Sequence, residues 1–155
     1  MFIYAEGATM QHSLHTFLLL VFSLLFAARV IGQAIQRWIP QSFLPPFESF
    51  QGSNFPYEFL LLIQIFILFI MFRVTWQVGW GQFVRRKRSA RIFAWVGGIY
   101  LIGSIARILI GAMLPTAHAW FKAGIPAFFH LVLAGFIIVL AICHSKMPNF
   151  ETKKI

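Results

Sequence analysis

Four long apolar stretches, separated by shorter polar connections, dominate the hydrophobic pattern of this chain. They cover approximately residues 14–36, 57–79, 92–114 and 125–144. Each is longer than the run of about 18 apolar residues that a helix needs to cross about 30 Å of hydrocarbon. The pattern therefore predicts an all-α fold, in which residues 1–155 form a single domain, an integral membrane bundle of four transmembrane helices.

The connection over residues 37–56 differs from the others in composition. It contains four prolines, which exclude a long continuous helix, and five aromatic residues, which favour the membrane interface. The segment is predicted to be a Pro/Phe-rich loop. Two interpretations stay open: a lid over the bundle, or a connector that lies on lipid headgroups.

Overall composition supports the membrane assignment. Hydrophobic residues make up 59% of the chain and charged residues 11%, and the mean hydropathy is +0.78. A soluble domain carries about 25% charged residues, so this chain cannot cover itself with a water-facing surface. A separate soluble domain is excluded.

The basic residues predict the orientation of the chain. Arg85–Arg91, here called the basic segment, holds five of the thirteen Lys and Arg residues; with the C-terminal tail it holds eight. The two other connections hold only Arg37 and Lys122. Because positive charge gathers on the cytoplasmic side, both termini are predicted to be cytoplasmic and the loop 37–56 to lie outside. The net charge of +9 is then explained by anionic lipid headgroups at the basic segment, and nucleic acid is not expected as a partner.

Each predicted helix has one face that collects polar or small residues, at 100° per residue. Such faces are expected to meet inside the bundle, because polar groups avoid lipid and small residues allow close packing. In chain order, the four faces are Phe22, Phe26, Arg29, Gln33 and Gln36; Glu58, Ile65, Phe69, Arg73, Trp76 and Trp80; Gly97, Tyr100, Ser104, Arg107 and Gly111; and Ala127, His130, Ala134, Ile137, Ala141 and His144.

Three basic side chains are expected at one depth in the outer half of the bundle. Arg29, Arg107 and His130 fall roughly 7–10 Å below the outer boundary at 1.5 Å per residue, with Glu58 nearer the surface. A charge at the centre of a spanning helix costs about 2.5–3.5 kcal/mol, and one carboxylate cannot fully pair two arginines.

Two interpretations follow from this shortage of negative charge. An anionic amphiphile, a lipid or a quinone, could bind in a layer formed by Arg29, Arg107, His130 and Glu58 together with Gln33 and Ser104. Alternatively, the arginines reach the interface or bond to groups of their own protein.

The histidines allow a different function, electron transfer through haem b. His130 and His144 lie 14 residues apart on one helix face, the spacing with which a transmembrane helix ligates two stacked haems. A single haem between His15 and His144 is also geometrically possible. This haem-binding membrane subunit is the alternative to the amphiphile-binding protein; the leading interpretation has no cofactor.

Motifs for catalysis or metal binding are missing from the sequence. The chain has no Cys-x-x-Cys, no His-Glu-x-x-His and no glycine-rich phosphate loop, and it contains no aspartate at all. An enzyme is therefore not expected, and neither is a metal site. The chain is interpreted as a small multi-pass membrane protein that binds an amphiphile or serves as an accessory subunit, in a homo-oligomer or a larger membrane complex.

One family resemblance can be drawn from the layout of the spans. With Glu58 opening the second span and with Gly97-Gly98 and Arg107 in the third, residues 57–142 resemble the DoxX-like small four-helix membrane proteins of bacteria. The resemblance implies a four-helix protein of the bacterial cytoplasmic (inner) membrane, often an accessory to a redox system. The long loop 37–56 departs from that pattern, as does His130, where such proteins can have a carboxylate.

Overall fold

The computed structural model describes residues 3–51, 55–114, 121 and 123–146, with side chains from Ser13 to Ser145 within these ranges. The helices of this described part, in chain order, are α1 (Ile3–Trp38), α2 (Phe47–Phe50), α3 (Tyr57–Gly79), α4 (Lys87–Met113) and α6 (Gly124–Lys146). Four of them are long and apolar enough to cross a membrane. The chain is an all-α protein, and the expectation of four spanning helices is confirmed.

The helix bounds differ from the predicted spans at two places. Helix α1 starts at Ile3, well before residue 14, and ends two residues before Pro40. Helix α4 starts at Lys87, so five of the seven residues of the basic segment are helical rather than in a loop. No glycine or proline lies between Gly81 and Gly97 to prevent this. The turn after α3 is made at Gly81, whose φ of 67° suits a residue without a Cβ.

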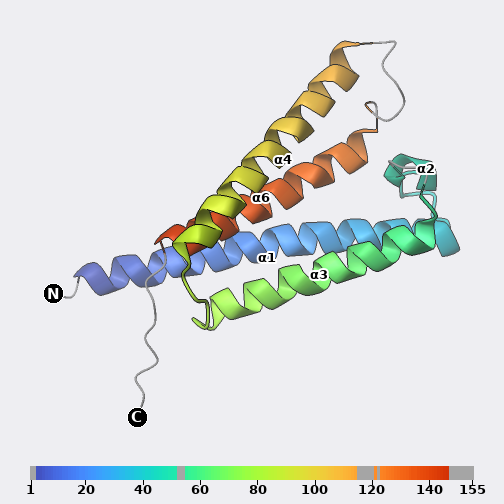
Figure 1. Cartoon of the computed structure of the whole chain (residues 1–155). Coiled ribbons are helices and arrows are strands. Elements are labelled where there is room, and N and C mark those ends of the chain that lie inside the picture. Colours follow the sequence, from blue (N-terminus) through green and yellow to red (C-terminus); the bar gives the residue numbers. More distant parts are fainter. Residues whose placement is uncertain (1–2, 52–54, 115–120, 122, 147–155) are drawn as a thin grey trace.

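The spanning helices pack in a row rather than around one centre. Helix α3 packs against α1, α1 against α6, and α6 along α4 (Figure 1). In Figure 1 the α1–α3 pair and the α4–α6 pair cross near the start of α4 and diverge toward α2. Because α4 packs mainly on α6, most of its surface is left to the surroundings.

Two glycines set the closest helix contacts. A Cβ on Gly97 of α4 would lie 2.9 Å from Ile138 Cγ1 and 3.3 Å from the Ile138 backbone nitrogen of α6. A Cβ on Gly135 of α6 would lie 2.7 Å from Cζ of Phe22, which comes from α1. Small residues let helices in a membrane approach closely, so α6 is held on both sides through glycine contacts.

Helix α6 is central, and three of the four predicted faces are confirmed by burial. Buried positions on these faces are Phe26, Arg29 and Gln33 of α1; Gly97, Ser104 and Arg107 of α4; and Ala127, Ala134, Ala141 and His144 of α6. The apolar core also contains Leu19, Val78 and Cys143, each 0% exposed.

The face predicted for α3 is wrong. Glu58, Arg73 and Trp76 are exposed, whereas the buried face of α3 consists of Tyr57, Gln64, Met71, Thr75 and Val78. The two charged residues lie near the ends of the helix, where long side chains reach the membrane interface and need no place inside the protein. The polar residue near the middle of the span, Gln64, is the one that is buried.

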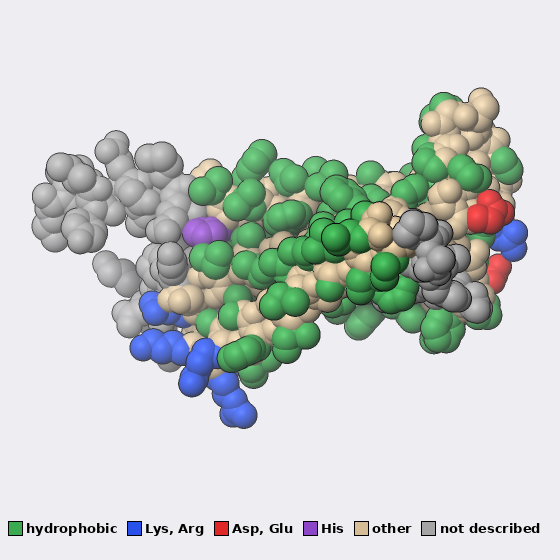
Figure 2. All heavy atoms as spheres, turned by 90° about the horizontal axis from the view of Figure 1, so that it is seen from above, with side chains coloured by type: hydrophobic (Ala, Val, Ile, Leu, Met, Phe, Trp, Pro, Cys, Tyr) green, Lys and Arg blue, Asp and Glu red, His purple; other side chains and the backbone are tan. Residues whose placement is uncertain are grey.

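The two ends of the bundle, taken along the direction of its helices, carry different charges. Most of the Lys and Arg side chains seen in Figure 2 gather at one end, which we call the basic end, and the acidic side chains lie at the other, which we call the α2 end. Between the ends the surface is largely hydrophobic, with exposed side chains such as Phe66, Ile99 and Leu109. This arrangement suits a protein whose sides face lipid.

The loop 37–56 packs on the protein through α2. Phe50 is buried, and its ring lies 3.9 Å from the position of a Cβ on Gly32 of α1. Helix α2 contacts both α1 and α6, so it connects the two helix pairs at the end where they diverge (Figure 1). Other aromatic residues of the loop, including Trp38 and Phe43, are exposed. One side of the loop therefore packs on the protein and the other faces outward, and a position on lipid headgroups stays a prediction.

The close α4–α6 contact gives a matched test. Gly97→Ala is expected to destabilise the protein by about 1–3 kcal/mol, because the new methyl group overpacks the contact with Ile138. Gly98→Ala is the control, since a Cβ there meets nothing within 4 Å and both changes give the same gain in helix propensity. Unfolding in mixed detergent micelles, followed by circular dichroism, measures the difference. Equal stability of the two variants would contradict the packing.

Candidate functional site

A group of polar residues lies buried in the half of the protein near α2. Arg29 and Gln33 come from α1, and Tyr57 and Gln64 from α3; their exposed fractions are 8%, 0%, 4% and 4%. Tyr100 and Arg107 of α4 and His130 of α6 interact electrostatically with Arg29 or with one another. We call these seven residues the polar layer.

Helix periodicity explains why these side chains converge. Arg29 and Gln33 are four residues apart on α1, and Tyr57 and Gln64 are seven apart on α3, so each pair shares one helix face. Gln64 Nε2 donates a hydrogen bond to Gln33 Oε1 at 3.4 Å, which joins the two faces.

Arg29 is the centre of the layer. Its Nη2 donates a hydrogen bond to the backbone carbonyl of Phe50 in α2 at 3.2 Å, and its guanidinium lies 5.6 Å from the ring centroid of Phe129. The guanidinium also interacts electrostatically with Tyr57 and Tyr100. Three helices and α2 thus supply its surroundings, and all of the groups named are neutral.

Arg107 approaches the layer from α4. It is 5% exposed and interacts electrostatically with Tyr100, which in turn interacts with Arg29. His130 interacts electrostatically with both arginines. Arg29, Arg107 and His130 thus lie near one another, with Tyr100 close to both arginines; their common depth in a membrane stays a prediction.

Negative charge is scarce around these arginines. Among the acidic residues whose side chains the structure describes, Glu48 and Glu58, both are exposed. Glu58 forms an ion pair with Arg37, with 3.7 Å between Oε1 and Nη2, at the rim of the protein. The expectation that Glu58 belongs to the same layer as Arg29 and Arg107 is not met, because Glu58 is on the outward side of α3.

Four buried polar atoms of the layer have no hydrogen-bond partner. They are Arg29 Nε, Gln33 Nε2, Tyr57 Oη and Gln64 Oε1. Exchanging the oxygen and nitrogen of both glutamine amides would not remove the deficit, because one amide NH₂ and one amide carbonyl would still be unused. Unpartnered buried polar groups cost about 1–3 kcal/mol each, so a native protein normally supplies a partner.

The chemistry of these free atoms defines what would fit. Arg29 Nε and Gln33 Nε2 donate, Tyr57 Oη donates or accepts, and Gln64 Oε1 accepts. A group with several acceptor oxygens and a negative charge matches the donors.

Two other predicted residues use their polar atoms within their own helix. Ser104 is buried, and its Oγ donates to the carbonyl of Tyr100 at 2.7 Å. His130 Nδ1 is hydrogen-bonded to the carbonyl of Pro126, and its ring lies 5.5 Å from that of Tyr100. Ser104 borders the layer, and His130 belongs to it.

The histidines considered for haem lie toward opposite ends of the bundle, His130 toward the α2 end and the other two toward the basic end. His144 of α6 and His15 of α1 are buried toward the basic end, and His144 lies 14 residues after His130 along α6. The centroid of the His144 ring lies 4.4 Å from that of Phe83 and 5.5 Å from that of Phe93. The Nδ1 atom of His144 has no hydrogen-bond partner. In the part of the chain with described side chains, no group of three or more His, Cys, Asp or Glu residues could hold a metal ion. Haem ligation stays a prediction.

Four contributors to the layer were not among the predicted site residues: Tyr57, Gln64, Tyr100 and the carbonyl of Phe50. The signal for Gln64 was present, since it is a polar residue near the middle of an apolar span, where polar groups face protein. Tyr57 lies seven residues before it, on the same face. No sequence signal pointed to the Phe50 carbonyl, because any residue carries one.

Comparison with known proteins finds no matching family model, no similar curated protein and no similar solved structure. Functional inference therefore depends on the geometry of the polar layer.

Proposed function

We propose that this chain is a small multi-pass membrane protein whose polar layer binds the anionic headgroup of an amphiphile, a lipid or a quinone bearing acceptor oxygens. The observation that carries the proposal is the set of four unpartnered polar atoms around Arg29, buried in a layer to which no described carboxylate contributes.

The energetic reason is the cost of burying charge. A guanidinium inside the hydrocarbon costs about 2.5–3.5 kcal/mol on insertion scales, and neutral carbonyl or ring partners offset that cost only in part. A phosphate or carboxylate would neutralise the charge and accept from the fork of N–H donors that a guanidinium presents. Gln33 and Tyr57 offer further donors to the same oxygens.

An amphiphile is favoured over a water-soluble anion by the surroundings of the layer. The described helices expose apolar side chains along their lengths, so the surfaces that lead to the layer suit a molecule with a hydrophobic tail. The proposal assigns no catalytic residue. Service as an accessory subunit of a membrane complex, with the amphiphile as its shared ligand, is compatible with it, and so is the resemblance to DoxX-like proteins.

We further propose the orientation and the location of the protein. The basic end faces the cytoplasm, with both termini there, and the α2 end faces outward, in the cytoplasmic membrane of a bacterium. The separation of positive and negative charge between the two ends supports the orientation. The polar layer then lies in the outer half of the bilayer.

The alternative function is electron transfer through haem b. The observation in its favour is the buried His144, whose Nδ1 lacks a partner between two aromatic rings. An absorption spectrum separates the two functions: a Soret band that disappears in His144→Ala would establish haem and replace the amphiphile as the ligand.

Ligand binding is tested by the lipids and quinones that co-purify with the protein. In Arg29→Gln/Arg107→Gln, occupancy by an anionic amphiphile is expected to fall roughly ten- to hundredfold, since a hydrogen bond to a charged group contributes about 1.5–3 kcal/mol. Mass spectrometry of organic extracts identifies the ligand and measures its occupancy, and it separates lipid from quinone.

Two further variants keep this test decisive. Arg73→Gln is the matched control, because Arg73 is an exposed arginine in a spanning helix. The amphiphile occupancy of this variant should equal that of the unmodified chain. Tyr57→Phe removes an unpartnered hydroxyl, so it should preserve the stability of the empty protein while weakening ligand binding. Unchanged occupancy in both the double variant and Tyr57→Phe would mean that the arginines are structural.

Orientation is tested by single cysteines in a background where Cys143 is replaced by serine. Arg88→Cys should react only with membrane-permeant maleimides in intact cells, and Phe43→Cys should also react with impermeant ones. Both positions are exposed, so access to the reagent depends on the side of the membrane. The reverse labelling pattern would refute the orientation.

A further inference from the structure

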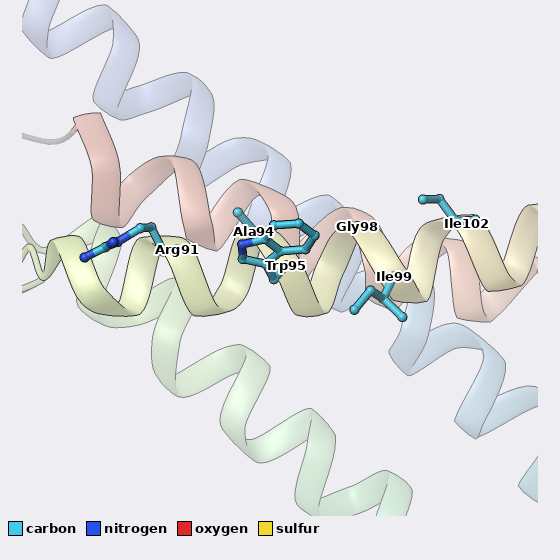
Figure 3. Close-up of a pocket in the computed structure, with 6 residues that line it drawn as sticks. All are labelled: Arg91, Ala94, Trp95, Gly98, Ile99 and Ile102. Carbon is cyan, nitrogen blue, oxygen red and sulfur yellow. The ribbon is translucent and has the colours of Figure 1, made fainter.

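A groove lies along α4 near the basic end, on a surface that the polar layer does not include. It has a volume of about 360 Å³ and is lined by Arg91, Ala94, Trp95, Gly98, Ile99 and Ile102 (Figure 3). These positions repeat at intervals of three and four residues, so they form a single face of the helix.

The groove has a notch at its centre. A Cβ on Gly98 would meet nothing within 4 Å, so the space over this residue is open. Trp95 and Ile102, 73% and 69% exposed, lie on either side of it along the helix. In Figure 3 the indole of Trp95 extends toward Gly98. The notch is a gap in an otherwise bulky apolar surface.

The length of the groove matches one leaflet of a bilayer. Arg91 and Ile102 are eleven residues apart, or about 16 Å at 1.5 Å per residue. The hydrocarbon core is about 30 Å thick, so a groove that starts at the interface ends close to the middle of the membrane.

Charge lies at only one end of the groove. Arg91 is exposed and extends along the helix away from Trp95, toward the start of α4 (Figure 3). The remaining basic residues of the basic segment, Arg85 to Arg88, immediately precede it at that end. The groove thus joins a cationic end to an apolar channel, which is the charge pattern complementary to an anionic lipid.

We propose that this groove is a binding site for one anionic phospholipid of the leaflet on the basic side. Its phosphate lies at Arg91, and one acyl chain lies over Gly98 between Trp95 and Ile102. This site is separate from the polar layer, since none of its lining residues belongs to that layer, and it does not depend on the proposed function.

A second copy of the chain fits the groove less well. Two copies that insert in the same direction and pair through this face around a twofold axis would place Arg91 of one beside Arg91 of the other. The basic segments would also be brought together. A lipid phosphate relieves this positive charge, whereas a second copy adds to it.

The test uses the full-length protein in nanodiscs with equal amounts of phosphatidylglycerol and phosphatidylcholine, analysed by native mass spectrometry. Gly98→Leu fills the notch and should remove one bound phospholipid. Arg91→Gln should lower the preference for phosphatidylglycerol roughly fivefold, the factor that one basic residue near an anionic surface contributes. Gly103→Leu and Arg88→Gln are the matched controls, because Gly103 also has open space and Arg88 does not line the groove.

Three outcomes would overturn the site. Equal loss of lipid preference in Arg91→Gln and Arg88→Gln would mean a diffuse basic surface. No change of lipid number in Gly98→Leu would mean that the notch is not used. A dimer that Gly98→Leu dissociates would show that a second copy occupies the groove. Loss of lipid in Gly98→Leu alone, with the ligand of the polar layer retained, supports the site whatever the outcome for Arg29 and Arg107.

Discussion

The burial of guanidinium charge within the spanning helices is the constraint on which the rest of this structure depends. Hydrocarbon offers no hydrogen bonds, so every donor of Arg29 and Arg107 must find a partner inside the protein or on a ligand. The described carboxylates, Glu48 and Glu58, are both exposed. The partners that surround Arg29 are therefore neutral groups: the Phe50 carbonyl, the Phe129 ring and the tyrosines of the polar layer.

This constraint gives meaning to features that packing alone does not explain. Helix α2 is short, yet it is fixed to the protein because Phe50 is buried and its carbonyl accepts from Arg29. The Gln33–Gln64 contact joins α1 to α3 but leaves an amide NH₂ and an amide carbonyl unused. Farther toward the basic end, the hydroxyl oxygens of Ser23 and Thr75 lie 3.4 Å apart between α1 and α3, and each hydroxyl also bonds the carbonyl four residues earlier in its own helix. Among the described side chains, those of the polar layer combine buried charge with several unused donors.

Much of the fold could be predicted from the sequence because hydrocarbon imposes strict rules. Length and hydropathy located four spanning helices, and the 3.6-residue period identified the buried faces of α1, α4 and α6, including Arg29, Gln33 and Arg107. The same period failed for α3, where Glu58 and Arg73 were given more weight than Gln64. Long charged side chains near helix ends reach the interface and need no burial, whereas an amide farther inside the span cannot reach it and must face protein.

The order of the helices could not be predicted in the same way. Periodicity shows which face of a helix is buried, but not which neighbour covers it, and the row α3–α1–α6–α4 depends on close approaches at Gly97 and Gly135. The site shares this difficulty. The Phe50 carbonyl, which was not predicted, is a backbone group, and only the tertiary structure determines its position.

The most direct measurement of the central claim is a crystal structure of the full-length protein grown in a lipidic mesophase that contains an anionic phospholipid. The account predicts a headgroup oxygen at about 2.7–3.2 Å from Arg29 Nε, with Gln33 Nε2 or Tyr57 Oη bonded to the same headgroup. A polar layer in which Arg29 and Arg107 bond only to protein groups, with no amphiphile between them, would contradict it.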